Sequence, residues 1–159
     1  MDQSIRNQVI YNQGIYTIIL ELDNNCHIQV GALGKITFPR GYYCYTGSAR
    51  GPGGFKRIER HKRVQSGSSH ARRWHIDYLL PHARWVDAVV TETRDDLECI
   101  TALKIGQSLR PVPGFGSTDC RCSGHLHYSD DLGLMAATVE SAHSGRSLLL
   151  DAETKNDLQ

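Results

Sequence analysis

The chain has 159 residues and a formal net charge of +1, with 40% apolar and 22% charged residues. This length corresponds to one domain, and the composition is typical of a soluble globular protein. No apolar run approaches the roughly 20 residues that a membrane-spanning helix needs, and no secretory signal follows Met1. We therefore expect a cytoplasmic protein without a membrane partner.

The small net charge hides an uneven distribution of charge along the chain. Residues 129–159 hold six acidic residues against two basic ones, whereas residues 50–73 hold eight basic residues against Glu59 alone. A solvated helix face is the ordinary interpretation of such a run, but a concentrated positive field also attracts the phosphates of nucleic acid. The residues that we expect to contact nucleic acid are Ser48, Arg50, Lys56, Arg60, Lys62, Arg63, Arg72 and Arg73.

Local residue patterns predict strands in the first third of the chain, followed by alternating helices and strands. In chain order, the expected elements are strands at 14–22, 27–30, 35–38 and 42–46, a helix at 55–64, a short apolar segment at 74–80, a strand at 85–91 and a helix at 95–106. The loops between them carry glycine, proline and serine. These elements indicate an α/β (α+β) domain with a small, mostly antiparallel sheet and flanking helices.

The C-terminal part of the chain gives a different signal. From Ser129 onward, apolar periodicity is weak and acidic residues dominate, which predicts a mobile tail or a loosely docked helix. We therefore expect a folded domain over residues 1–128 and an acidic, mobile tail over residues 129–159.

Two short tyrosine motifs lie in the predicted strands. The first, Gly-Ile-Tyr, ends at Tyr16, and the second, Tyr-Thr-Gly, begins at Tyr45. Tyrosine is ordinary in strands, so neither motif alone indicates a function. A phenol has an unperturbed pKa near 10, so a tyrosine that acts as a base requires nearby cations. We expect the two side chains to come from neighbouring strands.

Three further residues fit a site that hydrolyses phosphodiester bonds. Arg57 and His61 lie one turn apart in the basic helix, where arginine matches phosphate oxygens and histidine can position or deprotonate water. Glu98 lies near the start of the later apolar helix, where a carboxylate can hold a divalent cation. Each residue has an ordinary alternative as a surface or half-buried side chain. Together with Tyr16 and Tyr45, they predict a catalytic site in which Glu98 binds Mg²⁺ or Mn²⁺.

The cysteines give a weaker signal. The chain has five of them, an odd number without the spacing of a disulfide framework, which favours a reducing compartment. Cys44 and Cys99 lie in apolar contexts and are expected to be small buried residues. Elsewhere, His75 and Asp77 are expected to form a hydrogen-bonded structural pair, with a role in the site as the alternative.

A cluster of cysteine and histidine near residue 120 has two interpretations. Cys120, Cys122 and His125 could bind zinc with Asp119 or His127 as the remaining ligand. The spacing is compressed compared with zinc fingers, and no second cysteine pair is present. A tight loop with buried thiols is the alternative.

Taken together, these motifs resemble the GIY-YIG nuclease superfamily, and more closely its small, stand-alone, Uri-like branch, once described only as a domain of unknown function. The matching strings run from Phe38 to Gly54, from Trp74 to Leu80 and from Pro113 to Leu126, and the resemblance covers residues 14 to about 128. It implies a three-stranded antiparallel sheet with flanking helices, and a divalent-metal endonuclease site built from the two tyrosines, the arginine, the helix histidine and the glutamate.

The chain departs from the superfamily pattern in two ways. Tyr16 and Tyr45 are 29 residues apart, more than in the homing and excision-repair members, which implies an inserted hairpin. Many members also have an asparagine after the glutamate, and none lies between Glu98 and Tyr128, where Asp119 could take its place.

The expected function is divalent-metal-dependent endonuclease activity on DNA, in the repair or processing of structured DNA. The first alternative is a catalytically inactive nucleic-acid-binding module with the same fold, and the second is a partner-binding domain that uses the loop at 113–128. No separate DNA-reading domain is recognisable, so specificity is expected to come from this domain, a protein partner or self-association.

Overall fold

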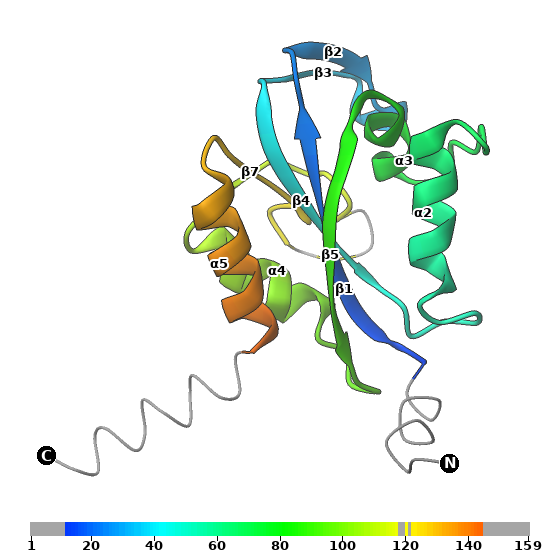
Figure 1. Ribbon diagram of the computed structural model, residues 1–159, viewed down its shortest axis with the longest axis vertical. Helices are drawn as coiled ribbons and strands as arrows, with labels where there is room; N and C mark the ends of the chain where they lie inside the picture. The colour runs from blue at the N-terminus through cyan, green and yellow to red at the C-terminus, as the bar shows by residue number, and fades with distance from the viewer. Residues whose placement is uncertain (1–11, 118–119, 121, 145–159) are drawn as a thin grey trace, which may run out of the picture.

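The computed structural model describes residues 12–117, 120 and 122–144, and its centre is a five-stranded antiparallel sheet in the order β5-β1-β4-β7-β6 (Figure 1). The strands are β1 (Gly14–Leu22), β4 (Gly41–Ser48), β5 (Arg84–Glu92), β6 (Arg110–Pro111) and β7 (Leu126–Ser129). The predicted mixed α/β class with antiparallel pairing is confirmed. The sheet has five strands rather than three because β5 pairs with the outer edge of β1, and β7 and β6 extend the sheet beyond β4.

A separate two-stranded sheet lies between β1 and β4 in the sequence. It consists of β2 (Cys26–Gln29) and β3 (Lys35–Phe38), joined through the short 3₁₀ helix η1 (Gly31–Leu33). This hairpin lies beyond one end of the main sheet (Figure 1) and accounts for the long separation between the tyrosine motifs. The insertion does not separate the two motifs in space, because β1 pairs directly with β4, with Tyr16 opposite Gly47.

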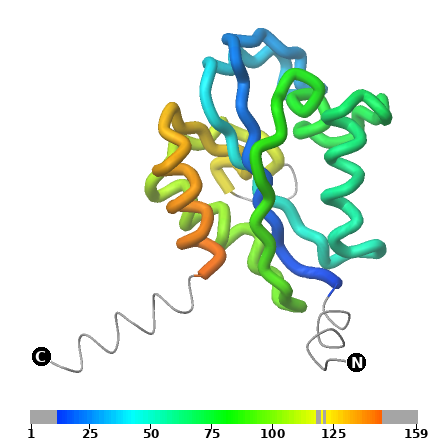
Figure 2. Tube along the Cα trace, in the orientation of Figure 1, coloured from blue at the N-terminus to red at the C-terminus, as the bar shows by residue number. Residues whose placement is uncertain are grey.

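Helices cover both faces of the sheet (Figures 1 and 2). On one side lie α2 (Lys56–Ser66), α3 (His75–Leu79) and the 3₁₀ turn η2 (Leu80–His82), and on the other lie α4 (Glu98–Gly106) and α5 (Leu132–His143). Side chains alternate between the two faces along a strand, so β1 contributes to two separate cores. Ile18 packs in the core under α2 and α3, whereas Ile19 packs in the core under α4 and α5.

Helix α4 begins three residues later than predicted, at Glu98 rather than Asp95. The backbone N–H of Asp95 donates to the hydroxyl of Thr93 over 3.0 Å. Such a local bond offers the backbone an alternative to the helix and is common just before helices begin. Glu98 is consequently the first residue of α4, and it lies in the first turn as predicted.

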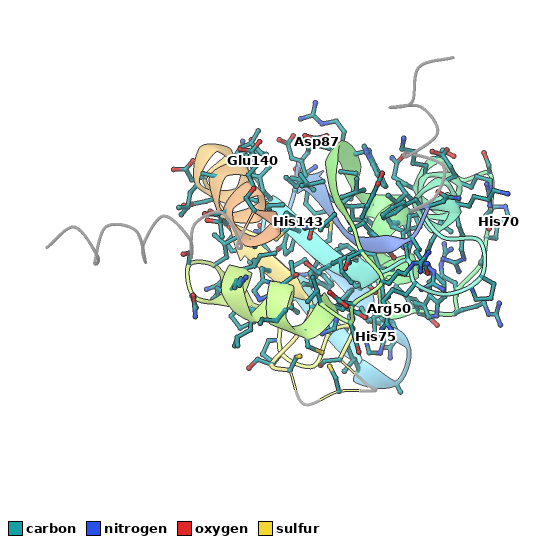
Figure 3. All side chains as sticks on the ribbon, turned by 90° about the horizontal axis from the view of Figure 1, so that it is seen from below. Arg50, His70, His75, Asp87, Glu140 and His143 are labelled. Carbon is teal, nitrogen blue, oxygen red and sulfur yellow. The ribbon has the colours of Figure 1, made fainter. Side chains whose placement is uncertain are left out.

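Residues 129–144 are folded, so of the two expected alternatives this segment contains a docked helix rather than a mobile tail. Helix α5 begins at Leu132, and Asp131 before it caps the helix, since its Oδ1 accepts a hydrogen bond from the backbone N–H of Leu134. Acidic residues such as Glu140 lie on the outer side of α5, while His143 faces the sheet (Figure 3). The buried residues of α5 are Met135, Val139 and Ala142. Residues 145–159 lie outside the described residues.

His143 anchors the end of α5 to the sheet through a polar network. Its Nε2 lies 2.8 Å from the hydroxyl of Thr17, and its Nδ1 lies 2.8 Å from the hydroxyl of Thr91. Both ring nitrogens are therefore paired, and burial lowers the pKa of His143 to about 4. No helix among the described residues is long and apolar enough to cross a membrane.

Candidate active site

A polar cleft of about 490 Å³ lies where β1 and β4 meet the starts of α2 and α4. It is lined by Tyr16, Tyr45, Gly47, Ser48, Arg57, Arg73, Trp74, His75, Glu98 and Gly116. Four of the five residues predicted to be catalytic therefore share one cleft, although they come from four separate elements. The fifth, His61, lies behind this lining.

The glycines of the two tyrosine motifs are required by close packing. A Cβ on Gly47 would lie 2.4 Å from the Tyr16 hydroxyl, so the phenol occupies the space of the missing side chain. A Cβ on Gly14 would lie 1.9 Å from the backbone oxygen of Thr91, on the neighbouring strand β5. The phenol of Tyr16 thus packs against β4 at Gly47, and Tyr16 lines the cleft.

His61 is buried directly behind Tyr16. Its Nε2 lies 2.7 Å from the Tyr16 hydroxyl, and the imidazole is 0% exposed. Burial, together with the charge of Arg60, lowers the pKa of His61 to about 4, so the ring is neutral at neutral pH. Nδ1 is buried and has no hydrogen-bond partner among the described residues. His61 can therefore act on the cleft only through Tyr16.

Both tyrosines are protonated at neutral pH. Burial raises the pKa of Tyr16 well above 10, and neighbouring Tyr45 raises it further. Burial also raises the pKa of Tyr45, with the charge of Glu98 as the next largest cause. The charge of Arg57 opposes these shifts at both sites. Neither phenol therefore carries a charge at rest.

Arg57 is held at the cleft by contacts on two sides. Its Nη1 donates to the backbone oxygen of Ser48 over 2.6 Å, and its guanidinium carbon lies 5.0 Å from the centre of the Trp74 ring. Stacking of a planar cation on an aromatic ring restricts its orientation. Among the described residues the guanidinium has no other hydrogen bond, so its remaining donors can bind an anion in the cleft.

Arg60 holds two helices together. Its two terminal nitrogens lie 2.9 and 2.8 Å from the carboxylate oxygens of Asp77, which is fully buried. Asp77 also accepts from the backbone N–H groups of Arg73 and Trp74 over 2.8 and 3.0 Å. Burial alone would raise the pKa of Asp77, but these bonds hold it below the usual range. Arg60 was expected to contact nucleic acid, yet its donor fork is engaged in joining α2 to α3.

His75 and Asp77 do not pair with each other, contrary to the expected structural pair. Asp77 is taken up by Arg60, and Nδ1 of His75 accepts the backbone N–H of Gly116 over 2.9 Å. His75 faces the cleft, where sequence reasoning had left its role open. The reason is the helical geometry of α3, in which residues two apart point in different directions.

The other predicted nucleic-acid contacts are spread over different environments. Ser48 and Arg73 line the cleft, whereas Lys56, Arg63 and Arg72 are exposed outside it. Arg50 and Lys62 are near acidic groups: Nη1 of Arg50 lies 3.5 Å from Asp96, and Nζ of Lys62 lies 3.8 Å from Glu59. Such exposed pairs are weak and can exchange for other anions.

Glu98 has a partner that sequence reasoning missed. Its Oε1 lies 3.0 Å from Nδ1 of His125, which lies just before β7 and is 2% exposed. Burial would lower the pKa of His125, but the hydrogen bond and the charge of Glu98 raise it above the ordinary value. No hydrogen bond to Oε2 of Glu98 occurs within the part of the chain that the structure describes. The same carboxylate thus contacts a histidine and faces the cleft.

Four side chains with metal-ligand atoms gather next to Glu98. The ligand atoms of Cys99, Cys120, Cys122 and His125 all lie within 4.8 Å of one another. Sequence reasoning named three of them and missed Cys99, which was expected to be a small buried residue. Of the suggested fourth ligands, His127 lies outside the cluster and against Gly106, whereas Asp119 is outside the described residues. No signal in the sequence pointed to Cys99, because only the fold brings the start of α4 to this loop.

Comparison with known families decides the membership of the chain. The model of the domain of unknown function DUF123 matches residues 15–148. The chain belongs to this family. No curated protein and no solved structure matches the chain. The DUF123 region begins in the first tyrosine motif and includes every residue of the cleft and of the cysteine cluster. It also includes α5, whose packing makes it part of the DUF123 fold rather than a tail.

Proposed function

We propose that this DUF123 domain is a divalent-metal-dependent endonuclease of the GIY-YIG type that hydrolyses phosphodiester bonds in DNA. The observation that carries the proposal is the 2.7 Å contact between Tyr16 and buried His61, at a cleft lined also by Arg57 and Glu98. A proton acceptor, a fixed positive charge and a carboxylate in one cleft are the groups that this hydrolysis requires.

The proton path supports the proposal. A water that attacks phosphorus must lose a proton, and a resting tyrosinate is unavailable because burial raises the pKa of Tyr16. His61 is neutral at neutral pH, so Nε2 can receive the hydroxyl proton of Tyr16 as that oxygen takes one from water. The low pKa of His61 makes this protonation transient. Such general-base assistance contributes roughly 10²–10⁴-fold to a rate.

Arg57 and Arg73 supply positive charge to the phosphoryl group. As oxygen attacks, negative charge grows on the phosphate oxygens, and a preoriented guanidinium stabilises it without reorganising. Arg57 is fixed by Ser48 and Trp74, so it meets this requirement more closely than Arg73, which has an exposed side chain. We assign the main electrostatic role to Arg57.

Glu98 is the residue that would hold Mg²⁺ or Mn²⁺. Its Oε2 is not engaged by His125, and the cleft around it is polar, which fits a hard cation that retains most of its waters. Such an ion, when bound, adds Lewis-acid charge at the phosphate and at the leaving oxygen. The contact of Oε1 with His125 fixes the orientation of the Glu98 carboxylate.

The proposal is tested by nicking of plain and structured DNA in Mg²⁺ or Mn²⁺, with RNA substrates in parallel. Arg57→Ala should lower kcat/KM roughly 10²–10³-fold, and Arg57→Lys should restore only part of it, because lysine lacks the planar fork. Arg40→Ala is the matched control, since it removes the same charge at the opposite end of β4 and should cleave like wild type.

A second pair of variants separates the Tyr16 hydroxyl from its ring. Tyr16→Phe should lower kcat roughly 10²–10⁴-fold, whereas Tyr43→Phe removes another buried hydroxyl, bonded to Pro39, without touching the cleft.

Equal cleavage by Arg57→Ala and wild type would remove Arg57 from the mechanism. If wild type cleaves no nucleic acid but binds it in a salt-sensitive way, the domain is a binding module instead.

A further inference from the structure

We propose that Cys99, Cys120, Cys122 and His125 bind one structural zinc ion, and that this ion fixes Glu98 at the edge of the cleft. The first part is independent of the activity. The second part, the link to Glu98, rests on the proposed endonuclease function.

The distances fit a tetrahedral site. With Zn–S bonds near 2.3 Å and Zn–N bonds near 2.0–2.1 Å, the ligand atoms of a tetrahedron stand about 3.6–3.8 Å apart. Nε2 of His125 lies 3.4 Å from Sγ of Cys120 and 3.8 Å from Sγ of Cys99. All four ligand atoms lie within 4.8 Å of one another. The four ligand atoms are thus close enough together for one ion to contact all of them.

The donor set selects the metal. Three thiols and one imidazole are soft or borderline donors, which favour Zn²⁺ and disfavour Mg²⁺ or Ca²⁺. Four protein ligands fill a tetrahedral shell and leave no position for a substrate. The site is therefore structural and chemically distinct from the oxygen-rich position that we assign to Glu98.

Glu98 orients the histidine ligand. A metal-bound histidine usually donates its second ring N–H to a carboxylate or carbonyl group, which fixes the tautomer and the orientation of the ring. Nδ1 of His125 lies 3.0 Å from Oε1 of Glu98, which leaves Nε2 directed at the sulfurs. Glu98 thus contacts a ligand of the metal, His125, and also lines the cleft.

The backbone holds His125 in place while the ion would join two separate segments. The His125 N–H donates to the oxygen of Phe115 over 2.7 Å, and the Thr46 N–H donates to the oxygen of His125 over 3.0 Å. Cys99 belongs to α4, whereas the other three ligands belong to the loop before β7. A zinc ion would therefore cross-link the start of α4 to this loop, next to Gly116 of the cleft.

The first test is the metal content of the full chain, purified under reducing conditions from zinc-containing medium. We expect about one zinc ion per chain. Cys99→Ser and Cys122→Ser should each lose most of it, while Cys26→Ser, which removes a thiol outside the cluster, should keep it. Glu98→Gln should weaken zinc affinity about 10–100-fold without changing the ligands.

The second test uses wild type alone, so that it does not depend on the folding of variants. Replacement of the metal by Co²⁺ should give thiolate-to-cobalt charge-transfer bands and intense tetrahedral d–d bands. Chelation should increase hydrogen exchange in residues 98–106 and 112–126, with residues 56–66 unchanged. Absence of both zinc and cobalt–thiolate bands would overturn the proposal, as would iron with inorganic sulfide or a disulfide between these cysteines in the reduced preparation.

Cleavage assays separate this proposal from the proposed function. Glu98→Gln should abolish cleavage at a zinc concentration that saturates its site, whereas Cys99→Ser should lose both zinc and most cleavage. If Cys99→Ser loses zinc but cleaves like wild type, the link to Glu98 is wrong and the zinc site stands. If wild type binds zinc but cleaves nothing, the proposed endonuclease function and the proposed link between zinc and Glu98 are both wrong, and the zinc site is confirmed.

Discussion

The two walls of the cleft are held by different chemistry. In the wall formed by α2 and α3, buried Asp77 binds Arg60, and the Trp74 ring lies 4.0 Å from the guanidinium of Arg60. In the wall formed by the start of α4 and the loop before β7, the polar contacts converge on His125, which lies between Glu98 and three sulfur atoms. Contacts between protein groups hold the first wall, whereas the second wall contains four ligand atoms that lie within 4.8 Å of one another.

Because of this difference, the position of Arg57 and the position of Glu98 depend on different contacts. Arg57 is positioned by the protein-only wall and should keep its orientation under chelation. Glu98 is positioned by the wall with the cysteine cluster and should respond to the loss of metal. Substitutions in the first wall, or in the core of the sheet, should therefore change stability without changing the zinc content of the second wall.

The largest loss of stability is expected for Asp77→Ala. The substitution leaves Arg60 and two backbone N–H groups without their buried acceptor, and removal of one partner of a buried ion pair costs about 3–5 kcal/mol. Denaturant unfolding measures this loss, and Glu59→Ala, which breaks an exposed ion pair, should stay within about 0.5 kcal/mol of wild type. The zinc content of folded Asp77→Ala should be unchanged, and its loss would show that the walls are not independent.

A core substitution outside both walls should destabilise the fold and leave the cleft intact. Met135→Ala on α5 opens a cavity against the sheet and should cost about 2–5 kcal/mol in unfolding free energy. Leu134→Ala removes an exposed neighbour on the same helix and should change stability by less than about 0.5 kcal/mol. At a temperature where both are folded, the two variants should bind zinc equally. Wild-type stability in Met135→Ala would argue against the packing of α5.

The smallest expected effect is a pH dependence that originates at His143. Its pKa is lowered to about 4 in the fold, against about 6.5 in the unfolded chain, so the unfolded state binds more protons between these values. Stability should therefore fall as pH falls from about 6.5 to 4, with His143 contributing on the order of 1–3 kcal/mol. His143→Gln should make this dependence less steep in denaturant titrations, whereas His82→Gln, at an exposed histidine, should leave the slope unchanged. The remaining slope is due to His61 and His127, because burial lowers the pKa of each of them to about 4 as well. An unchanged slope in His143→Gln would assign the effect to other groups.

Strands β1 and β3 could be predicted from the sequence to the residue, whereas β4, predicted at 42–46, extends one residue further at its start and two at its end. In β1 and β3, alternating β-branched and aromatic residues stop at turn-forming residues, so local chemistry determines both ends. Helix α5 is predicted only as the alternative to a mobile tail, because the acidic residues of 129–159 favour a solvated segment. Met135, Val139 and Ala142 recur at helical spacing, and that pattern was the signal that could have revealed it.

The roles of individual polar residues were harder to predict, since they depend on contacts between distant segments. Arg60 differs from its exposed neighbours only because Asp77, which lies 17 residues later, is folded against it. Cys99 joins the cysteine cluster only because the sheet places α4 beside the loop before β7. Tyr16, Tyr45, Arg57 and Glu98 were brought to one cleft as expected, because their motifs determine the elements that carry them.

The contact between Tyr16 and Gly47 has a consequence for how such chains evolve. These positions face each other across β1 and β4, and the phenol fills the volume that any side chain at 47 would need. A side chain larger than that of glycine at position 47 should therefore be tolerated only with a smaller residue at position 16, so the effects of such a pair of substitutions on stability should be strongly non-additive. In related chains, tyrosine at the position of Tyr16 should therefore occur together with glycine at the position of Gly47. The presence of both residues should separate true relatives from chance matches.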